Sequence, residues 1–274
     1  MKTLVLAALL SGFTLTSFAQ TDSTTTKADT IRIGGMIIIK KPGKNGGETR
    51  EVMINRSRQR KLTNVSTNWF IFDLGFANYK DETNYTAAQQ SGFVSPGVGK
   101  DNLKLRTGKS VNANIWIFMQ KLNLAKHYVN LKYGLGLELN NYRYDDERVR
   151  FAKNPTFIGL DPALANATKN KLAADYVTVP LMLNFNFTPT RKRGFGLSAG
   201  VSGGYLYSAR QKIKLNGDKT KLHDDFNLEK WKLSYIAELT LGPVRLYGSM
   251  AMKNMWEKGL DQTPYNIGIR FSHF

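Results

Sequence analysis

The stretch VNLKYGLGLELN, residues 129–140, alternates apolar and polar residues without interruption. Its odd-numbered positions are Val, Leu or Tyr, and its even-numbered positions are Asn, Lys, Gly or Glu. Successive side chains of a β-strand point to opposite faces, whereas a helix would mix the two sets. The stretch therefore predicts a strand with one apolar face and one polar face.

The same period of two recurs along the rest of the chain and predicts further strands. In one of them, Val111, Ala113, Ile115, Ile117 and Met119 are expected on the apolar face. Together with residues 129–140 the segments make eight strands. The other segments are residues 70–77, 111–120, 177–187, 195–207, 231–241, 244–253 and 265–272.

The connections between these strands alternate in length. Long ones cover about residues 80–103, 143–175 and 210–230, and short ones cover 121–127, 189–193 and 242–243. Tight turns at one rim and long loops at the other are typical of transmembrane β-barrels. The fold class predicted for residues 65–274 is therefore all-β, an eight-stranded antiparallel up-and-down transmembrane β-barrel with both ends in the periplasm.

A soluble lipocalin-type barrel also alternates, but with its apolar face inward. Many polar-face residues are Gly, Ser or Asn, which fit a narrow lumen, and aromatic residues gather near the strand ends, as in membrane-interface girdles. We therefore expect the apolar faces to meet lipid, so that Leu135→Arg costs more stability than Gly136→Ser. The girdle residues are Trp69, Tyr128, Phe187 and Phe195 at the turn side, and Tyr79, Tyr142, Tyr144, Tyr176, Tyr207, Trp231, Trp256 and Tyr265 at the loop side.

The N-terminal residues 1–19 have the pattern of a secretory signal peptide. Lys2 precedes the apolar run LVLAALL at residues 4–10, and Ser17-Phe18-Ala19 fits the cleavage rule, which gives a mature chain from Gln20. Export makes nucleic acid an unsuitable partner for a chain of formal charge +18. With no Cys in the chain, disulfides, Cys-bound metals and a lipoprotein anchor are excluded.

Residues 20–64 are expected to form a periplasmic extension. Thr21 to Thr30 is polar and predicted to be disordered, whereas Ile31–Lys40 and Glu51–Ile54 flank a turn and could pair as a hairpin. A basic patch then precedes the barrel, and it either contacts lipid phosphates or is a solvated linker. The patch consists of Arg56, Arg58, Arg60 and Lys61.

Three stretches carry a resemblance to a known family. They are residues 69–76 (WFIFDLGF), residues 176–183 (YVTVPLML) and the Gly-rich residues 198–205 (SAGVSGGY). The chain resembles the outer-membrane β-barrel domain family of Bacteroidetes-type Gram-negative bacteria, the PorT-like barrels. The resemblance implies an outer-membrane barrel over residues 65–274, whose C-terminal segment 265–274 is read by the barrel-assembly machinery.

Charged residues of both signs lie on the polar faces and are predicted to point into the lumen. Side chains just fill an eight-stranded barrel, and buried charges must pair. We therefore expect a lumen polar network that plugs the barrel and opposes passage of large solutes. Its members are Asp73, Lys132, Glu138, Lys232, Glu238, Arg245 and Arg270.

The three histidines of the chain are the first candidates for a catalytic group. His223-Asp224-Asp225 in the third long loop is a weak signal for a hydrolytic site, because it needs a nucleophile from elsewhere. Asp145-Asp146-Glu147 lies among arginines and lacks the ligand spacing of a calcium loop. No catalytic residue, cofactor or metal site is therefore predicted.

The expected function is that of a non-enzymatic integral outer-membrane protein with a structural or surface-interaction role. The alternatives are a narrow porin or transport component, and a barrel-type lipid- or peptide-modifying hydrolase. Expected partners are outer-membrane lipids and lipopolysaccharide, together with the barrel-assembly machinery during insertion. The loop residues expected to contact lipid phosphates are Lys212, Lys214, Lys219 and Lys221, and the longest loop adds Arg148, Arg150, Lys153, Lys169 and Lys171.

Overall fold

The computed structural model describes residues 29–33, 36–42, 48–54, 62–191 and 194–272, and the chain divides into two units between residues 59 and 60. In the first unit, β1 (Asp29–Ile33), β2 (Met36–Pro42) and β3 (Glu48–Ile54) form an antiparallel sheet in the order β1-β2-β3. The signal peptide predicted at residues 1–19 lies outside the described residues. So does the basic patch of Arg56, Arg58, Arg60 and Lys61.

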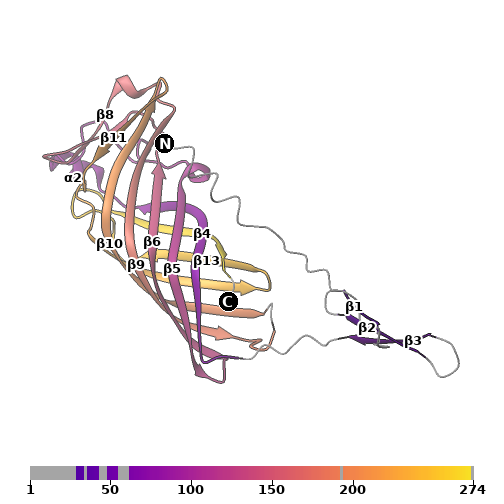
Figure 1. Ribbon diagram of the computed structural model, residues 1–274. Helices are drawn as coiled ribbons and strands as arrows, with labels where there is room; N and C mark the ends of the chain where they lie inside the picture. The colour runs from indigo at the N-terminus through magenta and orange to yellow at the C-terminus, as the bar shows by residue number, and fades with distance from the viewer. Residues whose placement is uncertain (1–28, 34–35, 43–47, 55–61, 192–193, 273–274) are drawn as a thin grey trace, which may run out of the picture. The chain divides into compact units, whose positions relative to one another are not determined.

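In the second unit, eight antiparallel strands of the described chain pair in a ring (Figure 1). The order is β4-β5-β6-β9-β10-β12-β13-β14, and β14 pairs with β4 to close it. The predicted eight-stranded fold is therefore confirmed. The strands are β4 (Val65–Asp81), β5 (Val111–Ala125), β6 (Val129–Arg143), β9 (Lys169–Asn186), β10 (Phe195–Leu215), β12 (Trp231–Leu241), β13 (Val244–Ala251) and β14 (Gln262–Phe271).

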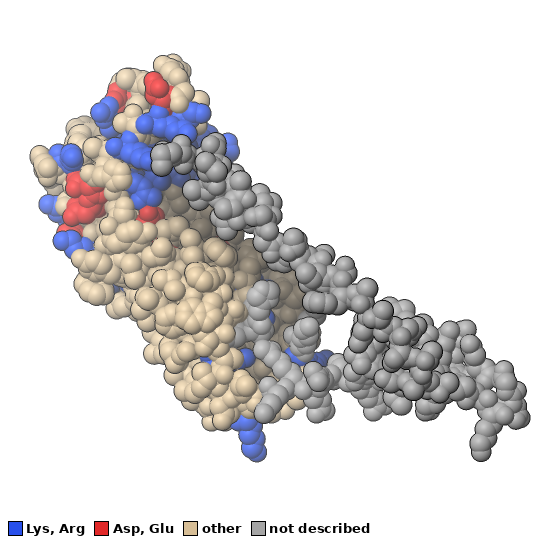
Figure 2. All heavy atoms as spheres, viewed as in Figure 1, with Lys and Arg blue, Asp and Glu red and all other residues tan. Residues whose placement is uncertain are grey.

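The outer face of the ring is apolar. Exposed side chains such as Phe72, Leu181 and Ile267 form a band around it, and Figure 2 shows few charges in this band on the face in view. Lys and Arg gather instead at the loop end, with a few at the turn end. An exposed apolar belt is what a barrel presents to lipid, which agrees with the predicted orientation of the strand faces. Among the described residues, no helix is long and apolar enough to cross a membrane.

Strand β5 departs from the predicted alternation after Trp116. Trp116 pairs with Gly136, but Phe118 pairs with the adjacent Leu135, so Ile117 is the extra residue of a β-bulge. A bulge shifts the following residues to the opposite faces. Met119, expected to face lipid, is therefore buried inside with no exposed surface, and this prediction was wrong.

Beyond the membrane band, the long connections and strand ends fold into a compact layer that we call the cap. Inside it a hydrophobic core includes Phe93, Tyr144, Phe151, Phe226 and Trp256. The rings of Phe151 and Trp256 stack at a centroid distance of 6.0 Å. The added elements of the cap are α2 (Tyr85–Gln90), η1 (Thr107–Lys109), β7 (Val149–Ala152), β8 (Phe157–Leu160), η2 (Pro162–Leu164) and β11 (Asp218–His223).

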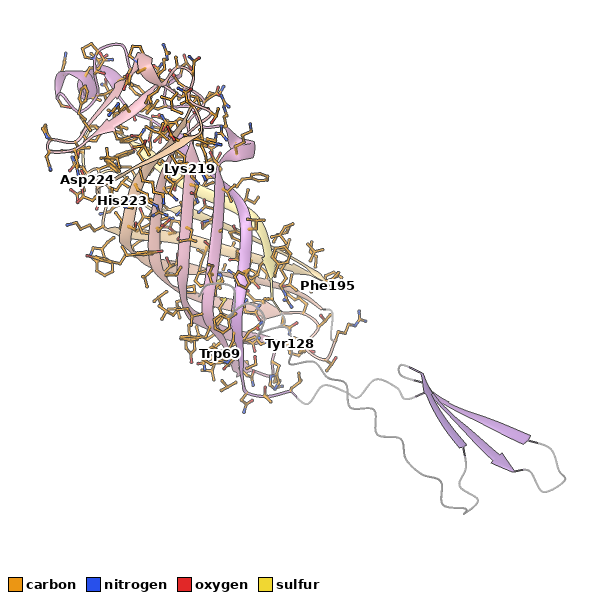
Figure 3. All side chains as sticks on the ribbon, turned by 45° about the horizontal axis from the view of Figure 1, so that its top comes forward. Trp69, Tyr128, Phe195, Lys219, His223 and Asp224 are labelled. Atoms are coloured by element: carbon orange, nitrogen blue, oxygen red, sulfur yellow. The ribbon has the colours of Figure 1, made fainter. Side chains whose placement is uncertain are left out.

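The cap corrects the predicted aromatic girdle on the loop side. Tyr142, Tyr144, Tyr176 and Trp256 are buried in the cap core rather than exposed at the membrane interface. The strands continue past the membrane, so inward positions there meet protein instead of a lumen. Tyr207, Trp231 and Tyr265 remain exposed on the loop side. At the turn side Trp69, Tyr128, Phe187 and Phe195 are exposed, and three of these are labelled in Figure 3.

Candidate functional site

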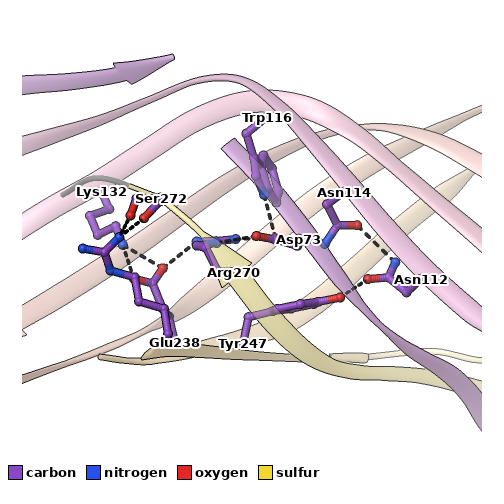
Figure 4. Close-up of polar contacts among 10 residues, drawn as sticks. Asp73, Asn112, Asn114, Trp116, Lys132, Glu238, Tyr247, Arg270 and Ser272 are labelled. Carbon is purple, nitrogen blue, oxygen red and sulfur yellow. Dashed lines mark hydrogen bonds and ion pairs between the residues drawn. The ribbon is translucent and has the colours of Figure 1, made fainter. Parts of the chain in front are cut away.

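The centre of the lumen network is the pair Asp73 and Arg270, which oppose each other directly on β4 and β14 (Figure 4). Arg270 donates from Nε and Nη2 to the two carboxylate oxygens, each at 2.8 Å. Trp116 Nε1 donates to Asp73 Oδ2 at 2.7 Å, and Asn114 Nδ2 donates to it at 3.1 Å. The bidentate geometry and the two added donors satisfy a carboxylate that has no access to solvent.

Two further ion pairs cross the lumen between β6 and β12. Lys132 Nζ lies 2.7 Å from both carboxylate oxygens of Glu238, which also accepts from Arg270 Nη1 at 2.5 Å. Lys232 pairs in turn with Glu138. Because β6 and β12 are separated by β9 and β10 in the ring, these ion pairs connect strands that do not pair with each other.

Neutral amides connect the charged pairs. Asn140 Nδ2 donates to Glu138 at 3.1 Å, and its Oδ1 accepts from Asn112, which also donates to Asn114 Oδ1. Asn266 Nδ2 reaches Glu138 at 3.2 Å. The asparagines thus join the Glu138 pair to the Asp73 pair, so the lumen holds one connected network.

All seven predicted lumen residues are buried in the structure. Six of them form the network just described, and Arg245 donates to the carbonyl and hydroxyl of Ser272 at the end of the last strand. The sequence prediction missed the partners Trp116, Asn140 and Asn266, because alternation gives their face without naming their contacts. Removing one member of a buried ion pair typically costs about 3–5 kcal/mol, because the remaining charge is left buried without a partner.

The lumen is also crowded around its glycines. A Cβ placed on Gly136 would lie 2.7 Å from Trp116 Cε3 and 2.8 Å from Trp116 Cα. Those distances leave no room for a side chain unless the strands move. We therefore expect Gly136→Ser to strain the strand pairing, while its cost relative to that of Leu135→Arg stays a prediction.

A second candidate site is a cationic surface on β9, β10 and β11, which we call the lysine face. β10 continues to Leu215 and pairs with β11, so the residues expected in a third loop lie on strands. In the register Lys171, Lys212 and Lys221 form one row across the three strands, and Lys169, Lys214 and Lys219 form the next. Lys219 is labelled at the cap end in Figure 3.

The lysine face places like charges opposite one another on neighbouring strands. Directly opposed like charges on neighbouring strands destabilise a sheet. Among the described residues, no carboxylate lies within ion-pair distance of these six lysines. Arg148 and Arg150, by contrast, are paired with Asp146 and Asp161. In the described chain the lysine face thus differs from the arginines of the longest loop, whose charges are balanced by neighbouring carboxylates.

The remaining candidates have ordinary surroundings. His223 lies exposed at the end of β11 opposite Arg210, and the side chains of Asp224 and Asp225 accept backbone N–H groups of their own turn. The carboxyls of the predicted acidic cluster, Asp145 to Glu147, are each paired with an arginine. The hydrogen bonds from Arg148 hold the pKa of Asp146 at about 2. The described residues contain no group of three metal-ligating side chains.

A closed ring with an apolar exterior and a polar lumen defines an integral outer-membrane type of β-barrel. The family model described as outer membrane protein beta-barrel domain matches residues 72–249, and the chain belongs to this family. No curated protein matches the chain.

Among solved structures, the chain is similar to Ail, the attachment invasion locus protein of Yersinia pestis. The identity is 11%, 77% of this chain and 100% of Ail are covered, and the TM-score is 0.33. A structure described under asymmetric conductivity of engineered proteins is 9% identical, with coverages of 76% and 99% and a TM-score of 0.18. Both likenesses are distant, so the family match carries the assignment.

Proposed function

We propose that this protein is a plugged, non-enzymatic outer-membrane barrel whose lysine face binds the phosphates of lipopolysaccharide. The observation that carries the proposal is that six lysines lie in two rows and that no carboxylate of the described residues lies within ion-pair distance of them. Each Lys near an anionic membrane surface contributes about 1 kcal/mol before salt screening. A phosphate between opposed lysines would also relieve their mutual repulsion. The role is therefore structural or one of surface interaction.

The proposal includes the cellular route and origin. The chain is exported with a signal peptide cleaved after Ala19, and it is a Bacteroidetes-type, PorT-like member of its family. The barrel-assembly machinery inserts it, and nucleic acid is not a partner. The supporting observations are the N-terminal sequence pattern and the stretches at residues 69–76, 176–183 and 198–205. N-terminal sequencing of the mature protein, with Gln20 expected first, tests the cleavage site.

Lipopolysaccharide binding is tested by removing charge from the lysine face. The variant replaces Lys212, Lys214, Lys219 and Lys221 by Gln, and binding is measured in detergent over a salt series. We expect a weaker affinity and a shallower dependence on salt. The control replaces the exposed residues Lys104, Lys109, Lys230 and Lys258 by Gln, which removes the same charge from scattered positions. Equal losses in the two variants would contradict a dedicated site.

The two alternative functions have direct tests. The cross-lumen ion pairs and the cap core favour a barrel without steady conductance, so single-channel recordings in planar bilayers should show no discrete steps. Regular steps would instead support a narrow porin. For a hydrolase, His223→Ala should abolish lipid A or peptide cleavage, whereas our proposal expects no cleavage by either form.

A further inference from the structure

The wall of the barrel is interrupted on the loop side between β12, β13 and β14. The ladder between β13 and β14 ends at Met250 and Tyr265. The next residue outward on β14 is Pro264, which has no N–H to donate to a neighbouring strand. β14 nevertheless continues to pair with β4 as far as Gln262 opposite Asp81. The proline thus ends the pairing on one side of β14 only.

The chain after β13 bridges this interruption loosely. Met252 N donates to Leu233 O on β12 at 2.8 Å, and Met255 N donates to Gln262 O on β14 at 2.9 Å. The two residues between them, Lys253 and Asn254, line a cavity of about 270 Å³, which we call the side cavity. Its apolar lining residues include Tyr176, Trp231, Leu233, Met252, Met255 and Pro264.

The side cavity connects the lipid-facing surface with the interior. Trp231 and Leu233 are 69% and 55% exposed on the apolar outer face, whereas Tyr176 and Met255 are buried. At the inner end, Lys232 also lines the cavity, but its ammonium is already paired with Glu138. Glu229, Lys253 and Asn254 are the other polar lining residues, but seven of the eleven residues that line the cavity are apolar. A mostly apolar lining favours an apolar occupant over water.

We propose that the side cavity holds one acyl chain of a membrane lipid. Its exposed lining residues are continuous with the apolar band, where the surrounding medium is hydrocarbon. The volume lies below the roughly 300–1,000 Å³ of pockets for drug-sized ligands, so it fits one chain better than a whole lipid. The site is separate from the lysine face and does not depend on the function proposed there.

The test uses the full chain in phosphatidylcholine vesicles that contain a trace of phosphatidylcholine with a photoactivatable diazirine on its acyl chain. After illumination, labelled residues are mapped by mass spectrometry. Exposed Val179 reports contact with bulk lipid, and buried Met119 in the lumen reports background. We expect Met255 and Tyr176 to be labelled several-fold above Met119. Labelling of both at the level of Met119 would overturn the proposal.

Two variants sharpen the result. Ala251→Phe fills the side cavity from its buried wall and should remove the labelling of Met255 without changing that of Val179. Ala199→Phe, at an exposed position on β10, is the matched control and should leave the labelling of Met255 intact. Pro264→Val restores a backbone donor beside β13 and should reduce the labelling of Met255. If neither cavity variant changes the labelling of Met255, acyl chains reach that residue by another path and the proposal fails.

Discussion

On β6, Asn140 points into a polar lumen, and Tyr142, two residues further along, points into an apolar core. The same change occurs on β9 between Thr178 and Tyr176. In the membrane band the strands are apolar outside and polar inside, whereas in the cap they are apolar inside and carry lysines outside. The difference teaches that the surrounding medium, lipid or water, sets which face of a continuous strand must be apolar.

The largest loss of stability is expected when a buried carboxylate is removed from the lumen of the membrane band. Glu238→Leu leaves Lys132 and Arg270 buried without their shared carboxylate. Removing one partner of a buried ion pair costs about 3–5 kcal/mol, so the urea midpoint in detergent micelles should fall sharply. The exposed acid Glu257 provides the control Glu257→Leu, expected within about 0.5 kcal/mol of the parent. Equal midpoints for the two variants would mean that the lumen charges are hydrated rather than desolvated.

The cap should unfold without unfolding of the barrel when its apolar core is disrupted. Trp256→Ala removes a ring that packs against Phe93 and Phe151, at a cost of about 3–5 kcal/mol for a buried Trp. The loss should appear as faster proteolysis of the cap, while the gel shift between boiled and unboiled protein persists. Disappearance of that shift would show that the cap and the ring unfold as one unit.

The outer faces should differ in their tolerance of charge. Leu135→Arg places a guanidinium on the lipid side of β6 and should cost about 2–4 kcal/mol. Gln90→Arg, at an exposed position on α2 in the cap, should cost almost nothing. Urea unfolding in phospholipid vesicles measures both. A reversed order would mean that the lipid-facing side has been assigned wrongly.

The smallest expected effect is acid loosening of the cap. Hydrogen bonds from Arg148 lower the pKa of Asp146 from 3.8 to about 2, so the folded cap favours the ionised carboxylate. This contribution is complete above about pH 4 and is lost as the pH falls toward 2. Protease susceptibility of the cap should therefore rise over that range, and Asp146→Asn should flatten the rise. An unchanged profile in this variant would exclude Asp146 as a contributor.

Much of the membrane-embedded part could be predicted from the sequence. The alternation at residues 129–140 and in the other strands identifies which face meets lipid, and it placed Asp73, Lys132 and Arg270 inside. The predicted faces are wrong where a local irregularity interrupts the alternation of apolar and polar residues. The bulge at Ile117 turned Met119 inward, and nothing in the alternation of its neighbours signals an extra residue.

The cap could not be predicted in the same way. Its core joins residues far apart in the chain, such as Phe93, Phe151 and Trp256, which lie in segments without regular alternation. The sequence predicted a cationic surface from the lysines at 212–221, but their alignment with Lys169 and Lys171 depends on strand pairing. A single segment does not specify its partners, because pairing depends on the register of three strands at once.

The sequence by itself determined the barrel class and the lipid-facing side of its strands. Each spanning strand has one face toward lipid and the other toward the lumen, so its residues alternate between apolar and polar. It also determined which charges enter the lumen. Only the tertiary structure decided how those charges pair across the barrel, where the strands leave the membrane, and that the β13–β14 pairing stops beside Pro264. These features depend on contacts between distant segments, and such contacts are fixed only when the ring closes.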